Sequence, residues 1–258
     1  FADASDFTFV FVGSFTPEMM KPLVERYLAS LPALHRNETW KDVGIRPPKG
    51  VVEKTVLKGI EPKSQAAIVF TGPFQHDQEH RVALRALGMV LDTKLREVLR
   101  EDLSGTYGVS VSPGYTKIPT ETYTFSIQFG CNPQRTDELV KVAFQEIDNL
   151  KKNGPSDKQV SDVREQMIRD FETNMQQNGY LLTQIYLRYQ VPEDLGKFFG
   201  LAEYYKTLNA KMIWDAARTY LNMDNYVKVL LLPENKAEAN LLEIDRDDEP
   251  AGEQRPAA

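Results

Sequence analysis

The chain has 258 residues, of which 41% are hydrophobic and 26% are charged, a composition typical of a globular protein with room for one large domain and additional pieces. Its net charge of −6 and the lack of a basic stripe argue against a nucleic-acid-binding protein. The single cysteine, Cys131, excludes an internal disulfide and a multi-cysteine metal site, and no apolar run approaches the roughly 18 residues of a membrane-spanning helix. We therefore expect neither a nucleic acid nor a membrane as partner.

The first part of the chain predicts one strand and one helix. Residues 7–13 are β-branched and aromatic and end in a glycine, which is typical of a buried strand. Thr16 followed by Pro17 predicts a helix start, and the helix should extend to about Ser30. Because one strand and one helix cannot close a core, we interpret residues 1–32 as the end of a preceding, related domain. The start without a methionine likewise indicates a piece of a longer protein.

Residues 33–50 are rich in proline and charge and predict a linker, after which a second unit covers residues 51–235. The strands predicted in it cover 52–58, 64–71, 106–112, 122–129 and 226–232, and the helices cover 77–102, 137–152, 156–190, 195–207 and 210–221. Strands first and helices grouped later predict an α+β domain, with a mostly antiparallel sheet and helices packed on one face. Residues 236–258 predict an acidic, mobile tail.

One motif suggests a zinc site within this chain. The segment His76-x-x-Glu79-His80 matches the inverted zincin pattern, in which two histidines four residues apart on a helix hold Zn²⁺ and the glutamate acts as a base. A third ligand would be needed, and nothing selects among Glu146, Glu165 and Glu172. The alternative is an ordinary polar helix start, with acidic residues near the positive end of the helix dipole. A histidine that precedes the helix would favour this alternative.

A second motif is the segment Leu95-Arg-Glu-Val-Leu-Arg-Glu-Asp-Leu-Ser-Gly-Thr-Tyr-Gly-Val109, which places Arg100 seven residues before Tyr107 across a predicted helix-to-strand junction. Together with Gly72-Pro-Phe and the segment from Tyr226 to Glu234, it resembles the C-terminal part of pitrilysin/insulinase-family zinc peptidases, in particular the bacterial long forms. From the residues alone, Tyr107 could also be a core tyrosine and Arg100 a solvated surface charge.

The resemblance implies a fold and a role. Such peptidases consist of four related α+β domains, of the type shared by LuxS-like and pitrilysin-like metalloenzymes, in two halves that close around the substrate. The N-terminal half binds zinc, and no zinc is expected in this fragment. Arg100 would bind the peptide substrate, and the Tyr107 hydroxyl would bind it and support the tetrahedral oxyanion of the catalytic step.

The partners expected from the resemblance are the N-terminal half of the same polypeptide and a peptide or small protein substrate, in the bacterial periplasm or another exported location. The fragment alone would be inactive. Two other functions stay open: a non-catalytic structural or assembly subunit of the same fold family, and a self-contained zinc hydrolase that uses His76, Glu79 and His80. An incomplete sheet in the first segment would also expose an edge at residues 7–12, through which the fragment could form a homodimer.

Overall fold

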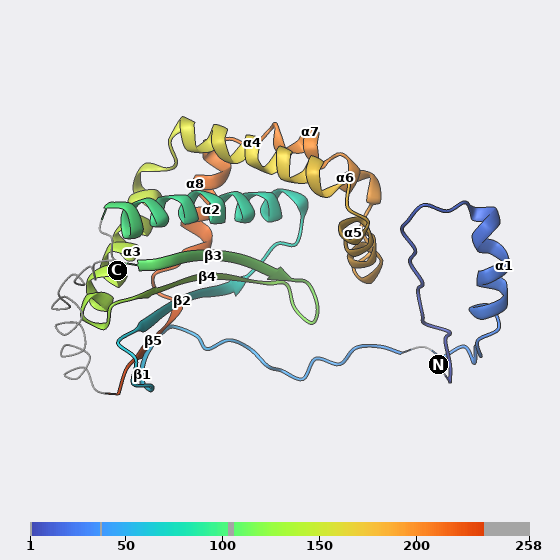
Figure 1. Ribbon diagram of the computed structural model, residues 1–258, viewed down its shortest axis with the longest axis horizontal. Coiled ribbons are helices and arrows are strands. Elements are labelled where there is room, and N and C mark those ends of the chain that lie inside the picture. The colour runs from blue at the N-terminus through green and yellow to red at the C-terminus, as the bar shows by residue number, and fades with distance from the viewer. Residues whose placement is uncertain (1, 37, 103–105, 235–258) are drawn as a thin grey trace, which may run out of the picture. The chain divides into compact units, whose positions relative to one another are not determined.

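The computed structural model describes residues 2–36, 38–102 and 106–234, with residues 101, 102 and 107 described by their backbone alone (Figure 1). The expected tail at 236–258 lies outside these residues. The chain divides into two compact units. The first unit consists of residues 1–45, 117–120 and 161–208, and the second consists of 46–116, 121–160 and the chain from Asn209 onward.

The second unit is built on a five-stranded sheet. Its strands are β1 (Val51–Leu57), β2 (Ser64–Pro73), β3 (Thr106–Thr116), β4 (Thr122–Cys131) and β5 (Tyr226–Leu232), in the order β1-β5-β2-β4-β3. β1 pairs with β5 in parallel, whereas the pairs β5–β2, β2–β4 and β4–β3 are antiparallel. The prediction of a mostly antiparallel sheet is therefore confirmed.

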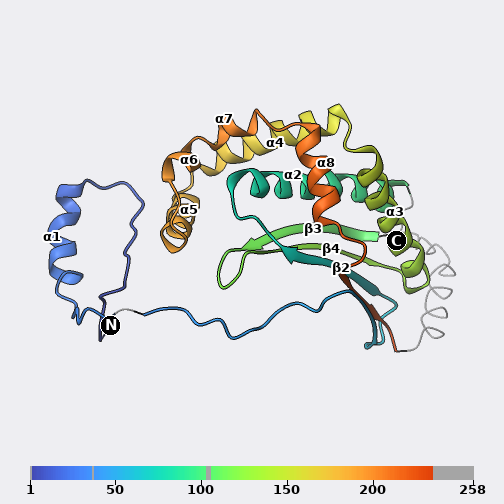
Figure 2. The same cartoon turned by 180° about the vertical axis from the view of Figure 1, so that it is seen from behind.

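Three helices of this unit cover one face of the sheet: α2 (Gln78–Arg96), α3 (Thr136–Asn153) and α8 (Ala210–Tyr220) (Figures 1 and 2). Alternate residues of β4 are buried against them, among them Phe125 and Ile127, and the leucines of α2 from Leu84 to Leu95 form a buried stripe. Burial of large apolar side chains on one face of a sheet is the main source of stability in such a layer. This arrangement confirms the α+β fold.

The remaining helices follow the predicted pattern closely. A short 3₁₀ turn, η2 (Pro133–Arg135), precedes α3, and the helix predicted over 156–190 is divided into α4 (Asp157–Asn174) and α5 (Asn178–Gln190). The helix predicted over 195–207 is divided at Gly200 into α6 (Leu195–Phe199) and α7 (Leu201–Tyr205). In the first unit, the Phe171 ring lies 5.7 Å from that of Phe198 and 6.2 Å from that of Tyr205, and this aromatic cluster forms a small core.

The first segment contains its predicted helix but not its predicted strand. α1 (Pro17–Tyr27) begins after Thr16, whose hydroxyl accepts a hydrogen bond from the Met19 N–H at 3.3 Å, and it ends before the predicted Ser30. The strand predicted over 7–13 is wrong, because these residues belong to no sheet in the part of the chain that the structure describes. A strand needs a neighbour for its backbone hydrogen bonds, and no described strand pairs with this segment. Phe7, Phe9 and Phe11 are each more than 40% exposed.

Candidate functional site

The junction between α2 and β3 presents Arg100 to solvent. α2 continues into a π-helical turn, η1 (Glu97–Asp102), which contains Arg100 with an exposed side chain. The neighbouring Leu99 is completely buried and fixes the turn to the core. Single π-helical turns are rare and occur often at functional sites, because they reorient the side chains that follow a regular helix.

β3 begins with an irregularity at Tyr107. Thr106 pairs with Cys131 but Gly108 pairs with Gly130, so β3 contains one extra residue between them. The Thr106 hydroxyl donates a hydrogen bond to the carbonyl of Gly130 at 2.6 Å and stabilises this β-bulge. Side chains along a regular strand alternate between the two faces of the sheet, but a bulge interrupts this alternation. The alternation of β3 therefore does not place Tyr107 with the core residues of the strand. The side chain of Tyr107 lies outside the described residues, and its role stays a prediction.

The sheet face opposite the helices carries a shallow pocket next to this junction. It has a volume of about 440 Å³ and reaches Gly108, the residue after Tyr107. Its lining is formed mainly by Gln65, Ala67, Ser110, Gln128, Val229 and Leu231. No charged side chain lines it among the described residues, and its side chains are apolar or uncharged polar. An extended peptide could therefore lie on this face next to the Arg100–Tyr107 junction.

α2 approaches β3 closely at Gly88. A Cβ atom added to Gly88 would lie 2.8 Å from Cγ and 2.9 Å from Cδ of Pro113. Only a glycine allows the helix backbone to come this close to the strand. The sequence contained no signal for this contact, because Gly88 lies within a helical pattern and Pro113 in a strand, where each would ordinarily weaken the element.

The His76-x-x-Glu79-His80 segment does not form the geometry that zinc would require. Asp77 is the N-cap of α2, so His76 precedes the helix and the two imidazoles do not share a helix face. Nδ1 of His80 lies 2.7 Å from Oδ1 of Asp77, and Nδ1 of His76 lies 3.3 Å from an Arg81 guanidinium nitrogen. Throughout the described part of the chain, no group of three His, Cys, Asp or Glu side chains is placed to hold a metal ion. The described residues therefore do not fit a zinc site, and Glu146, Glu165 and Glu172 complete none.

Comparison with known proteins assigns the family. Residues 1–167 match the family described as the peptidase M16 inactive domain. The chain therefore belongs to the M16 peptidase family, as the inactive domain of a zinc-protease-like protein. This result confirms the resemblance inferred from the Arg100–Tyr107 segment.

Individual relatives agree with this assignment. The chain is 31% identical over 206 residues to a zinc protease PQQL-like protein of Arabidopsis thaliana, covering 74% of this chain and 21% of the relative. It is 28% identical over 176 residues to a probable zinc protease PqqL of Haemophilus influenzae, covering 66% of this chain and 19% of the relative. The chain thus spans about a fifth of the length of these relatives.

A solved structure supports the fold. The periplasmic protease PqqL from Escherichia coli superposes with a TM-score of 0.72 at 21% identity, covering 86% of this chain and 24% of that protein. In the part of the chain that the structure describes, no helix has the length and apolar character needed to cross a membrane.

Proposed function

We propose that this chain is the zinc-free C-terminal portion of a zinc metalloendopeptidase and forms one wall of its substrate chamber. The observation that carries the proposal is the junction of α2 and β3: an exposed Arg100 on a π-helical turn, followed by a bulged strand start at Tyr107 beside an uncharged pocket on the open sheet face. A shallow surface without charged side chains, lined by apolar and amide groups, suits an extended peptide backbone.

Each residue of the pair has a distinct role in this proposal. The Arg100 guanidinium is planar and always charged, so it can donate two parallel hydrogen bonds to a carboxylate or to backbone carbonyls of the substrate. The Tyr107 hydroxyl can bind substrate and donate a hydrogen bond to the oxyanion that develops during peptide hydrolysis. No zinc chemistry is assigned to residues of this chain.

The parent protein would supply the remaining parts. Its N-terminal half would bind the zinc and close around the substrate, since this chain spans only about a fifth of its curated relatives. Residues 1–32 would complete a preceding related domain, 33–50 would form a linker, and 51–235 would be the C-terminal domain. A periplasmic or other exported location is proposed because the superposed Escherichia coli protease is periplasmic.

The experiment that tests the pair uses the full-length parent. Arg100→Ala or Tyr107→Phe should each lower kcat/KM for peptide hydrolysis by at least about 10-fold, because one transition-state contact is lost. Matched controls are Arg169→Ala, in an exposed i, i+4 ion pair on α4, and Tyr115→Phe, on an exposed residue of β3. Unchanged kcat/KM in both test variants would reject the assignment.

Fragment complementation separates this function from that of a non-catalytic subunit. The purified N-terminal half, mixed with this chain, should cleave peptides, whereas neither part should do so alone. If the N-terminal half were fully active alone, or if the full parent cleaved no peptide, the structural or assembly role would be favoured.

Self-association is a separate proposal. The exposed segment 7–12 carries Phe7, Phe9 and Phe11 and could pair with the same segment of a second copy. Phe9→Asp should then convert a dimer into a monomer in analytical ultracentrifugation. A monomeric mass of the unmodified chain at high concentration would count against the dimer.

A further inference from the structure

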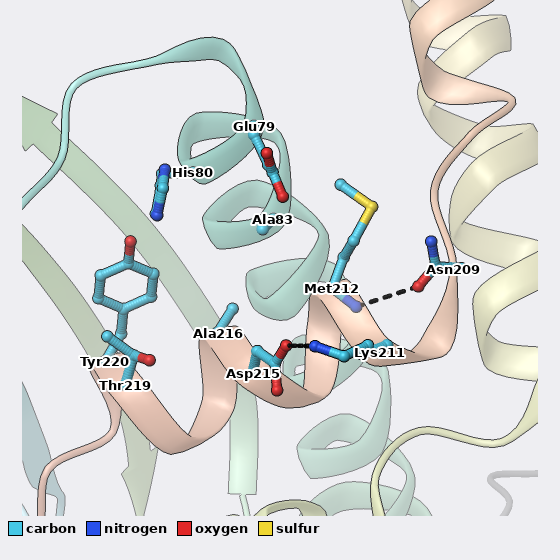
Figure 3. A pocket seen from close by; sticks show the side chains of 10 residues that line it. All are labelled: Glu79, His80, Ala83, Asn209, Lys211, Met212, Asp215, Ala216, Thr219 and Tyr220. Carbon is cyan, nitrogen blue, oxygen red and sulfur yellow. Dashed lines mark hydrogen bonds and ion pairs between the residues drawn. The ribbon is translucent and has the colours of Figure 1, made fainter.

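A second pocket lies within the second unit, between the start of α2 and α8 (Figure 3). It has a volume of about 400 Å³, which is within the usual range of small-ligand sites. α2 contributes Glu79, His80 and Ala83, and α8 contributes its length from Lys211 to Tyr220. Two residues of the rejected zinc motif, Glu79 and His80, thus line a pocket that has no role in the proposed protease function.

The imidazole of His80 is held in one orientation by Asp77. Its Nδ1 lies 2.7 Å from Oδ1 of Asp77, which also accepts the His80 backbone N–H at 2.9 Å. Partial burial pushes the pKa of Asp77 upward, but the hydrogen bonds from the His80 backbone and ring outweigh it and leave the pKa below its usual value. The carboxylate can only accept, so Nδ1 carries a proton, and in the tautomer that this contact selects Nε2 is the acceptor.

Tyr220 contributes a hydroxyl to the same pocket. The residue is 2% exposed, and its ring packs 4.8 Å from that of Tyr123 and 5.7 Å from that of Phe74. Figure 3 shows its hydroxyl pointing toward the His80 ring. Burial, with a smaller effect of the Asp77 charge, raises its pKa to about 12. A hydroxyl that lines a pocket can donate a hydrogen bond to a ligand or accept one from it.

The charge of the pocket favours a cation. Glu79 and Asp215 line it, and the only lining cation among the described residues, Lys211, is ion-paired with Asp215. Ala83 and Ala216 are buried and form an apolar floor with Met212. Figure 3 shows the Glu79 side chain extending toward Met212, so an acidic group lies beside an apolar surface. The Glu79 carboxylate would repel an anionic ligand, and Lys211, which is already paired with Asp215, would not compensate for this repulsion.

We propose that this pocket binds the side chain of a lysine presented by a peptide or protein. An ammonium group has three donors, and the pocket offers three acceptors on separate side chains: the Glu79 carboxylate, Nε2 of His80 and the Tyr220 hydroxyl. The floor of Ala83, Ala216 and Met212 suits the four-carbon stem of lysine, which packs along apolar surface while its charged end is solvated or paired. This inference does not depend on the proposed protease function.

The test is an NMR chemical-shift titration of the complete chain with Nα-acetyl-lysine methylamide. The matched probe is Nα-acetyl-norleucine methylamide, which has the same stem without the ammonium group. The lysine probe should shift the backbone signals of Glu79, His80 and Thr219, and the norleucine probe should bind at least about 5-fold more weakly because it makes no charge-assisted hydrogen bond.

Two variants locate the binding. Glu79→Gln removes an exposed charge, and Tyr220→Phe removes the hydroxyl while keeping the packed ring, so each should raise the Kd of the lysine probe about 3- to 10-fold, as expected for one hydrogen bond. Asp137→Asn, on the exposed first turn of α3, removes the same charge elsewhere and should leave the Kd unchanged.

Three outcomes would overturn the proposal: equal binding of the two probes, equal effects of Asp137→Asn and Glu79→Gln, or no shifts at the pocket. Binding of pentylamine without binding of the lysine probe would overturn the assignment to a peptide-borne side chain.

Discussion

The carboxylate of Asp92 on α2 accepts a hydrogen bond from the backbone N–H of Val111 in β3, with 3.1 Å between Oδ1 and the nitrogen. β3 is the outer strand of the sheet, and this N–H points to the helix rather than into the ladder with β4. Two residues further on, Pro113 has no N–H to expose. A helix side chain and a proline thus close part of an edge that could otherwise pair with another strand.

Replacing Asp92 by alanine should expose this edge. The lost acceptor leaves the Val111 N–H unpaired, and we expect a loss of about 1–2 kcal/mol in the free energy of unfolding, or roughly 2–8 °C in Tm. Amide hydrogen exchange at Val111 should become faster. Arg96→Ala removes only the ion pair of Arg96 with Asp92 and should cost less than about 0.5 kcal/mol. Unchanged exchange at Val111 in Asp92→Ala would contradict the assigned hydrogen bond.

Substitution of Gly88 should destabilise the domain although alanine favours helices. The added Cβ would lie 2.8 Å from Pro113, and overpacking of this kind costs about 1–3 kcal/mol, more than the roughly 1 kcal/mol gained in helix propensity. Gly179→Ala, in α5, meets no atom within 4 Å and should stabilise slightly. Urea unfolding measures both changes. If Gly88→Ala were as stable as Gly179→Ala, α2 would not lie this close to β3.

Stability should fall with rising pH above about pH 10 because of Tyr123. Burial, with a smaller effect of Tyr220, raises the pKa of the Tyr123 hydroxyl to about 12 from 10.0. Between these values the unfolded chain releases the proton and the folded chain keeps it, so the free energy of unfolding decreases as pH rises. The stability is fully present below about pH 10 and is lost up to about pH 12.

The matched variants test this pH dependence. Tyr123→Phe should lower the free energy of unfolding at neutral pH by about 1–2 kcal/mol, since the hydrogen bond to the Tyr220 carbonyl at 2.9 Å is lost, and should flatten the decrease between about pH 10 and pH 12. Tyr189→Phe, at an exposed position, is the control. An equal slope in Tyr123→Phe and the unmodified chain would show that another group causes the decrease.

Zinc content should be low. After purification without chelators, the chain should contain less than roughly half a zinc ion per molecule, because a genuine three-ligand site would retain the metal. His76→Ala and His80→Ala should not change this content. Stoichiometric zinc by atomic absorption that His80→Ala abolishes would restore the hypothesis of a self-contained hydrolase.

Most elements could be predicted because their signals are local. Thr16 is a helix N-cap in the structure as predicted, and the period of the leucines in α2 follows directly from burial of one helix face. The α+β class followed from the order of these elements. The family resemblance was most specific in the segment from Leu95 to Val109, and Gly72-Pro-Phe and the segment from Tyr226 to Glu234 contributed to it.

Other features depend on atoms far away in the sequence. The strand expected over 7–13 has the right residues but no partner within the described chain, and a strand without a partner does not form. The bulge at Tyr107 and the π-helical turn at Arg100 are properties of how α2, β3 and β4 pack together. The contact of His80 with Asp77 could have been predicted, because Asp77 is a capping residue three positions earlier. The approach of the Tyr220 hydroxyl to His80 could not, because the two residues are far apart in the sequence.

The place of β5 has a consequence for how the second unit assembles. β1 and β2 are close in sequence but do not pair with each other, because β5 lies between them. They join the same sheet only when residues 226–232 insert between them. Formation of the sheet must therefore wait for a contact that spans most of the domain, and such non-local closure slows folding. During synthesis, β1 and one edge of β2 would stay unsatisfied until nearly the whole domain has emerged, and this interval is when the chain most needs protection from aggregation.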